Sequence, residues 1–179
     1  TKIINQPKPL VIGDTQYSKN IFSFRWSNEE REAIGLYEVV FDNTNKKDEA
    51  YYTNTNQTFA FADGAVTASY GSATAKALAD VTNEDDSITL GLKSQHKGKI
   101  KQQASSLLAT YDWYVVRKAD AGTAVPSAVT TYRAAVRTKS GEMETLIDNA
   151  ANVDALAALY VYNNDNPPVR PLGEFPEAV

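Results

Sequence analysis

Residues 100–137 constrain the fold of this chain most, because their pattern predicts two helices joined by an aromatic corner. Apolar residues recur every four positions over residues 88–109, which is the spacing of one helix face. A second helix is predicted over residues 126–138, where the leading proline suits a first helical turn. Residues 111–114 (Tyr-Asp-Trp-Tyr) lie between the two and predict a turn. We expect Trp113 to fill the gap between the crossing helices as a core anchor.

Glycine and proline mark the predicted ends of the helical segments. Gly98 lies inside the first helix and predicts a kink there, since glycine costs about 1 kcal/mol relative to alanine in a helix. Ser140-Gly141 predicts a break before a further helix over residues 142–150. Asn152 is a good cap for a final short helix. Residues 163–179 are rich in proline and predict an extended tail.

The first half of the chain has strand and turn signals instead. Ser27 and Glu30 have the spacing of a capping box, which predicts one short helical turn. Residues 36–41 then read as a strand. Asp63-Gly64 is a preferred two-residue turn between alternating segments, so a hairpin is expected around it. These signals favour a small antiparallel meander of strands.

The predicted fold class is therefore α+β. We expect an extended N-terminal arm over residues 1–20 and a β-rich subdomain over residues 21–87. A helical hairpin or bundle over residues 88–162 follows, and then the proline-rich tail over residues 163–179.

Composition excludes several classes of function. The net charge of −4 argues against non-specific nucleic-acid binding, which needs a positive field to replace counterions. The chain has no cysteine, so disulfides and thiolate metal sites are excluded. It also lacks a continuous apolar run of about 18 residues, so no membrane-spanning helix is expected. A local run of lysines predicts a solvated helix face or, alternatively, a site for polyanions: Lys93, Lys97, Lys99 and Lys101.

The sequence holds no recognisable catalytic, cofactor or metal motif, and we expect a protein that is not an enzyme. His96 is the single histidine and has neither a serine elbow nor a set of metal ligands around it in sequence. The acidic residues 84–86 are expected to complement a helix N-terminus. Paired carboxylates remain the alternative, for a glycan-processing or wall-cleaving enzyme. The candidates are Glu29, Glu30, Asp42, Asp63, Asp112 and Glu142.

One polar constellation stands out around the aromatic corner, formed by Asp112 with Arg117, Arg133 and Arg137. It predicts either an ion pair that locks the helical hairpin or an arginine patch that binds a partner's carboxylates and carbonyls. A third possibility is a carbohydrate-binding module, in which exposed tyrosines stack on sugars. The tyrosines considered for it are Tyr51, Tyr52 and Tyr70.

Residues 88–160 resemble the C-terminal module of bacteriophage tail-fibre assembly proteins and related phage tail proteins. In that module Leu-Leu, Asp-Trp, a proline-bearing loop and Tyr-Arg-x-x-aliphatic-Arg recur in this order. The matching residues here are Leu107, Leu108, Asp112, Trp113, Arg117, Pro126, Tyr132, Arg133, Val136 and Arg137. A looser likeness upstream involves Gly35, Val39, Val40, Tyr52 and Gly64.

The resemblance implies a non-enzymatic phage tail protein, which acts in tail-fibre assembly or as a small tail-attached adaptor. Its implied partners are phage tail or tail-fibre proteins, or further copies of itself, and its implied location is the virion tail or the host cytoplasm during assembly. The chain departs from the family pattern in its proline-bearing segment 1–9 and in its longer end after Gly141. Both departures predict tethers to neighbouring proteins and favour a stable virion component.

Overall fold

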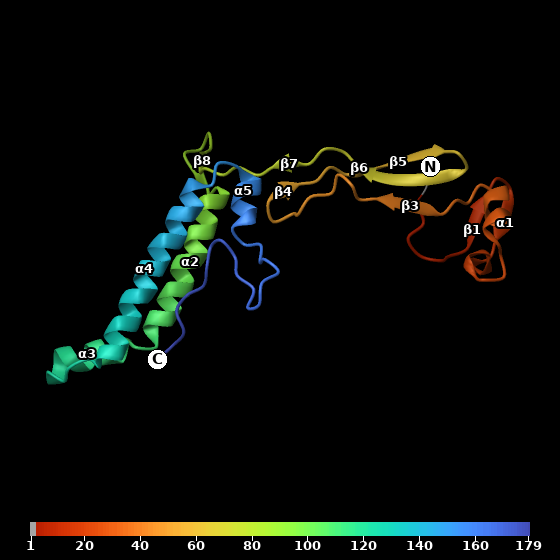
Figure 1. The fold of residues 1–179 in the computed structure, drawn as a ribbon. Helices are drawn as coiled ribbons and strands as arrows, with labels where there is room; N and C mark the ends of the chain where they lie inside the picture. The colour runs from red at the N-terminus through yellow and green to blue at the C-terminus, as the bar shows by residue number, and fades with distance from the viewer. Residues whose placement is uncertain (1–2) are drawn as a thin grey trace. The chain divides into compact units, whose positions relative to one another are not determined.

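The computed structural model describes residues 3–179 and divides them into two compact units (Figure 1). Unit 1 contains the chain up to Lys47 together with Asn54–Ala73. Unit 2 contains Asp48–Thr53 and Thr74–Val179. Strands dominate unit 1 and helices dominate unit 2, so the predicted α+β class is confirmed. The observed division differs from the boundary expected at residue 87, because several short strands belong to the helical unit.

Unit 1 begins with a hairpin in the region for which an extended arm was predicted. Strand β1 (Leu10–Ile12) pairs with β2 (Thr15–Tyr17), and Gly13 adopts a left-handed φ of 59° in the turn between them. A short 3-10 turn, η1 (Lys19–Phe22), follows. Helix α1 (Asn28–Ala33) then begins at the predicted capping box, which the structure confirms in both of its hydrogen bonds. Thr1 and Lys2 lie outside the described residues.

A three-stranded sheet forms the rest of unit 1. Strands β5 (Gln57–Ala62) and β6 (Ala65–Tyr70) make the predicted antiparallel hairpin. Its turn residues Asp63 and Gly64 have φ angles of 53° and 77°, as a type I′ turn requires. Strand β3 (Val39–Asp42) pairs with β6 in parallel, which gives the order β3-β6-β5. The strands consecutive along the chain, β3 and β5, are therefore not neighbours, and in this detail the sheet is not a simple meander.

Unit 2 contains two further strand pairs. Strand β4 (Tyr52–Thr53) pairs with β7 (Thr74–Ala75), and β8 (Val81–Thr82) pairs with β9 (Ile88–Thr89). The acidic residues 84–86 lie in the turn between β8 and β9, so their predicted place at a helix N-terminus is wrong. Asp85 instead accepts hydrogen bonds from the amide and the hydroxyl of Ser87.

Four helices form the body of unit 2: α2 (Leu92–Ala109), α3 (Asp112–Ala121), α4 (Ser127–Asn149) and α5 (Val153–Ala158). Two predicted breaks are wrong, because α2 continues through Gly98 and α4 continues through Ser140-Gly141. The turn predicted for residues 111–114 is also largely helical, because α3 begins at Asp112 and is capped at its C-terminus by Gly122, whose φ is 69°. The predicted cap by Asn152 is confirmed, since its side chain accepts a hydrogen bond from the amide of Ala155.

Helices α2 and α4 lie side by side and share two apolar clusters. One cluster includes Leu92 and Ile100 of α2 with Met143 and Ile147 of α4. The other surrounds Tyr132 near the opposite end of the pair. On α4 the buried residues recur at three- and four-residue spacing, and on α2 Leu92, Ile100 and Ala104 are eight and four residues apart. Each set lies on one side of its helix, so the apolar stripe predicted from the sequence holds the two helices together. Leu146 departs from that stripe and is exposed, although it was expected to point inward.

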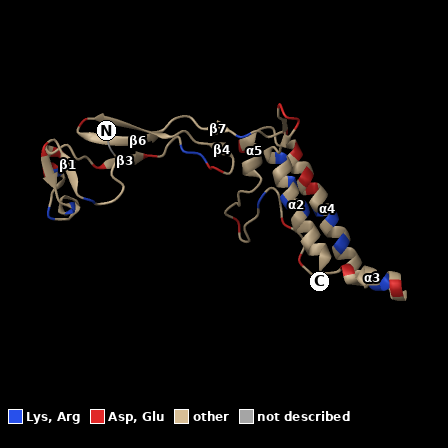
Figure 2. Cartoon of the chain, turned by 180° about the vertical axis from the view of Figure 1, so that it is seen from behind, with Lys and Arg blue, Asp and Glu red and all other residues tan. Residues whose placement is uncertain are grey.

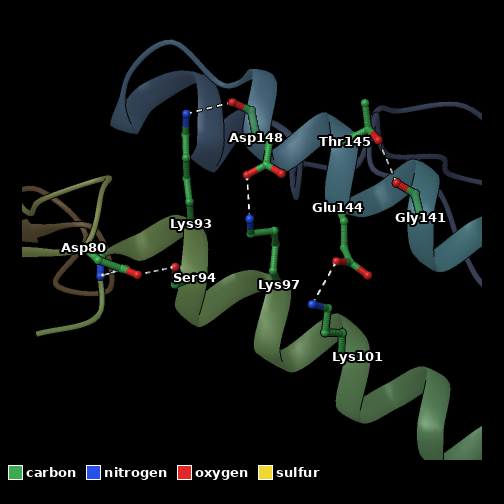
Figure 3. A network of polar contacts seen from close by, with 10 residues as sticks. Asp80, Lys93, Ser94, Lys97, Lys101, Gly141, Glu144, Thr145 and Asp148 are labelled. Carbon is green, nitrogen blue, oxygen red and sulfur yellow. Dashed lines mark hydrogen bonds and ion pairs between the residues drawn. The ribbon is translucent and has the colours of Figure 1, made fainter. Parts of the chain in front are cut away.

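The lysine run of α2 faces acidic groups of α4 (Figure 3). The Nζ atom of Lys97 lies 2.8 Å from Asp148 Oδ1, and that of Lys101 lies 3.3 Å from Glu144 Oε2. Lys93 donates to the main-chain oxygen of Asp148 at 2.8 Å. These contacts with α4 engage three of the four lysines, so this run is poorly suited to bind a polyanion. Figure 2 shows the underlying pattern, in which acidic residues lie in the C-terminal part of α4 and basic ones in its N-terminal part.

The C-terminal segment 163–179, predicted to be an extended tail, contains no helix or strand and packs on the helices. Leu172 is fully buried in the cluster that includes Ile147, and its amide donates to the main-chain oxygen of Leu159 at 3.0 Å. Phe175 packs against both apolar clusters. The proline-rich sequence prevents helix formation but leaves these two side chains free to fill the core.

Candidate functional site

Most of the residues that carry the closer sequence resemblance lie where α2 ends, α3 begins and α4 passes, a region we call the helix junction. Its centre is a cluster of tyrosines. The ring of Tyr111 lies 5.1 Å from that of Tyr132 and 6.5 Å from that of Tyr114, measured between centroids. The Tyr111 hydroxyl donates to the main-chain oxygen of Val179 at 2.6 Å. Tyr111, rather than the neighbouring tryptophan, is thus the buried aromatic that joins the helices.

An arginine closes the end of α2. The Nη1 atom of Arg133 lies 2.8 Å from Asp112 Oδ1 and donates to the main-chain oxygen of Leu108 at 2.8 Å. The carbonyls of a last helical turn have no partner within the helix, and a cation there also complements the helix dipole. Asp112 sits in the first turn of α3, where a negative charge is favourable. This geometry favours the interpretation of Asp112 and Arg133 as a structural ion pair.

Trp113 is not a core anchor, and that prediction is wrong. The residue is 51% exposed on α3, the helix that runs away from the α2–α4 pair (Figures 1 and 2). The centroid of the indole lies 3.8 Å from the centroid of the Tyr114 ring. The guanidinium carbon of Arg117 lies 4.8 Å from the indole centroid and 5.2 Å from the centroid of the Tyr114 ring. Such stacking of a cation over aromatic faces orders long side chains at a surface.

The remaining arginine of the constellation does not join this group. Arg137 is exposed on α4 and donates, at 3.4 Å, to the main-chain oxygen of Arg133 on its own helix. Arg117 Nε and Tyr132 Oη are buried, and neither has a hydrogen-bond partner within residues 3–179. The structure therefore brings together Asp112 with Arg133 and, separately, Trp113 with Arg117.

The tyrosines considered for sugar binding take part in packing. Tyr51 stacks on His96 with ring centroids 5.7 Å apart and an interplanar angle of 12°. The hydroxyl of Tyr52 donates to Asp154 Oδ1 at 2.6 Å. Both residues are half-buried and pack against the main cluster of unit 2, so packing already covers part of each ring. Tyr70 lies in the other unit, on β6.

His96 forms a contact that the sequence did not indicate. Its Nδ1 atom lies 2.7 Å from the hydroxyl oxygen of Tyr160, which is distant in the chain. Burial, together with the charge of Lys99, lowers the pKa of the imidazole below its ordinary value of 6.5. Burial also raises the pKa of the Tyr160 hydroxyl to about 12. Both side chains are therefore neutral at neutral pH, which suits a packed hydrogen-bonded pair.

The candidate acid residues lie in turns, caps and ion pairs. Glu30 completes the capping box of α1, and Asp63 occupies the hairpin turn. Asp42 accepts two hydrogen bonds from Thr44, which lower its pKa. Glu142 lies 3.4 Å from the ammonium of Lys139. Within residues 3–179 no cluster of histidine and carboxylate side chains has the geometry of a metal site.

A cavity of about 260 Å³ lies beside α1 in unit 1. Its lining includes Arg31, whose guanidinium donates to the main-chain oxygens of Ile21, Ser23 and Trp26 at 2.9, 3.2 and 2.6 Å. The arginine thus holds the segment before α1 in place and has little donor capacity left for a ligand.

No family model, curated protein or solved structure matches this chain. None of the helices in the described part of the chain is long and apolar enough to cross a membrane.

Proposed function

We propose that this chain is a non-enzymatic phage tail protein, which acts in tail-fibre assembly or as a small tail-attached adaptor that binds neighbouring virion proteins. The sequence resemblance at the helix junction is the starting point. Its matching residues fall into two groups. Tyr132, Arg133 and Val136 hold the junction together, whereas Trp113 and Arg117 lie on α3.

The observation that carries the proposal is the exposed side of α3. Trp113 and Val116 are three residues apart and so share one side of the helix, where they are 51% and 65% exposed. Arg117 lies over the indole on the same side. Tryptophan and arginine are among the residues that contribute most to protein–protein binding energy. Because the two side chains are already stacked on each other here, less conformational entropy is lost when a partner binds. The helix junction is held together by buried residues, whereas this side of α3 is exposed. Such an arrangement suits protein binding better than catalysis.

The test is binding of the full chain to the full-length tail-fibre polypeptide encoded beside it, measured after co-expression and by titration of the purified proteins. Trp113→Ala is expected to weaken binding by about 30-fold or more, as for a hot-spot residue. Val115→Ala is the matched control. It alters an exposed side chain of the same helix that lies about 200° around the axis from Trp113, and binding should change by less than about threefold.

Two outcomes would overturn the proposal. One is a wild-type chain that does not bind the fibre polypeptide. The other is clearing of purified host cell walls by the chain alone, which would favour a wall-cleaving enzyme.

A further inference from the structure

The outer edge of β5 is open and lacks the usual protection of an edge strand. In the described chain β5 is paired on one side only, with β6. Residues 53–62 around it contain no charged residue and no proline (Thr-Asn-Thr-Asn-Gln-Thr-Phe-Ala-Phe-Ala). Native sheets normally guard such an edge with lysine, proline or a bulge, because unpaired main-chain groups recruit further strands.

The hairpin turn determines which main-chain groups face this edge. In a two-residue hairpin the positions flanking the turn, here Ala62 and Ala65, exchange both main-chain hydrogen bonds. Hydrogen-bonded pairs then alternate along the ladder, so Ala60 and Thr58 also bond to β6. The N–H and C=O groups of Gln57, Phe59 and Phe61 consequently point away from β6, toward the open edge.

We propose that two copies of this chain pair through β5, in antiparallel orientation about a two-fold axis at Phe59. The two three-stranded sheets then become one continuous sheet. With Phe59 opposite Phe59 of the second copy, Gln57 lies opposite Phe61 of that copy, and the reverse pair follows by symmetry. Every outward main-chain donor and acceptor of these residues gains a partner. This pairing involves unit 1 and a second copy of the chain, and it does not depend on the function proposed for the helix junction of unit 2.

Charge and side chains are compatible with this register. Asp63, the acidic residue nearest to β5 in the sequence, lies opposite Thr55 of the second copy in this register, so the Asp63 carboxylates of the two copies do not meet. Phe59 and Phe61 lie on the same face of the sheet as Phe41 of β3, through the pairing of each strand with β6. Phe41 and Phe61 are 62% and 59% exposed. Pairing brings the aromatic rings of the two copies together along one face, and cross-strand aromatic pairs stabilise sheets.

The first test is sedimentation velocity of the full chain from about 1 to about 100 µM, a range chosen to bracket modest affinities. We expect a reversible dimer. Phe61→Lys places on β5 the kind of charged side chain that prevents pairing of edge strands in native sheets, and it should weaken the dimer about tenfold or more. Phe41→Lys is the matched control, because this residue is equally exposed on the same face but lies on the opposite edge strand, and its dimer should persist. A chain that is monomeric throughout, or equal weakening by both variants, would overturn the inference.

The second test uses cysteine pairs and does not depend on either lysine variant folding. The chain has no cysteine of its own, so introduced thiols report without background. In the proposed register Thr58 lies opposite Ala60 of the second copy in a non-hydrogen-bonded pair, with Cα atoms about 4.5 Å apart. That separation permits a disulfide.

A mixture of Thr58→Cys and Ala60→Cys chains should therefore cross-link under mild oxidation, faster than either variant alone. Val40→Cys, an exposed position on β3, serves as the control and should not cross-link with Ala60→Cys. Cross-linking through Val40→Cys, or equal rates in all mixtures, would mean that β5 is not the interface.

Discussion

Gly91 is the N-cap of α2 and Gly98 lies within the helix, and their surroundings differ. A Cβ atom at Gly91 would lie 2.3 Å from the main-chain oxygen of Ala79, whereas a Cβ atom at Gly98 would meet nothing within 4 Å. We expect Gly98→Ala to raise the free energy of unfolding by about 1 kcal/mol, because alanine favours the helix. Gly91→Ala should lower it by about 1–3 kcal/mol through overpacking. Urea unfolding followed by circular dichroism measures both, and changes of the same sign would contradict the structure.

His96 makes the stability of unit 2 depend on pH. Burial lowers the pKa of the folded imidazole below its ordinary value of 6.5, so the unfolded chain takes up a proton more readily. The free energy of unfolding should therefore fall as the pH drops below 6.5 and level off below the pKa of the folded state. The groups around the ring are Tyr51, Tyr160 and Lys99, and none of them is a carboxylate that would stabilise the imidazolium.

Urea unfolding between about pH 5 and pH 7.5 measures this dependence, because most carboxylates titrate below that range. His96→Gln retains a polar side chain without a titrating ring, and its stability should vary less over the same range. A wild-type chain whose stability is constant across this interval would show that His96 is equally protonated in the folded and unfolded states.

At the scale of elements, the helix junction predicts a large and a small loss of stability for two aromatic residues that are two positions apart. Tyr111→Ala empties the buried centre of the junction and should cost about 3–5 kcal/mol of unfolding free energy. Trp113→Ala removes an exposed side chain and should cost about 1 kcal/mol or less. Thermal and urea unfolding of the two variants measures the difference. A loss of unfolding free energy well above about 1 kcal/mol for Trp113→Ala would indicate that the indole is buried and would argue against its role in a binding surface.

Local signals in the sequence were sufficient for several elements. The capping box at Ser27 and the Asp63-Gly64 turn both specify geometry within a few residues, and both are present in the structure. The four-residue spacing of apolar residues also identified the stripe of α2. Local sequence signals such as these predict the folded structure reliably, because the groups that satisfy them are close together in the sequence.

Elements whose limits depend on distant contacts were not predictable in the same way. Helix α4 passes through Gly141 because Val136, Met143 and Ile147 on either side of it are buried against α2, and their burial outweighs a glycine penalty of about 1 kcal/mol. The pair formed by Asp112 and Arg133 was among the possibilities that the sequence offered. The burial of Tyr111 in place of Trp113 was not, because it depends on the helical course of residues 112–121.

At the scale of the whole molecule, the C-terminal segment is part of the core of unit 2. Leu172→Ala should therefore lower the free energy of unfolding by about 3–5 kcal/mol, as for other fully buried leucines. Val169→Ala, at an exposed position of the same segment, should change it by less than about 0.5 kcal/mol. Chemical denaturation monitored at the helical signal compares the two. Similar small effects would mean that the segment is a detachable tether.

The two units are interleaved along the chain, and this has a practical consequence for protein engineering. The chain leaves unit 2 after Thr53, contributes residues 54–73 to unit 1, and re-enters unit 2 at Thr74. These two threonines are directly opposite each other in the β4–β7 ladder. A tight turn joining them would excise the excursion and close β4 and β7 into a hairpin. Conversely, a truncation that began at residue 74 would remove Tyr51 from its place over His96, so the helical body cannot be isolated by a single cut.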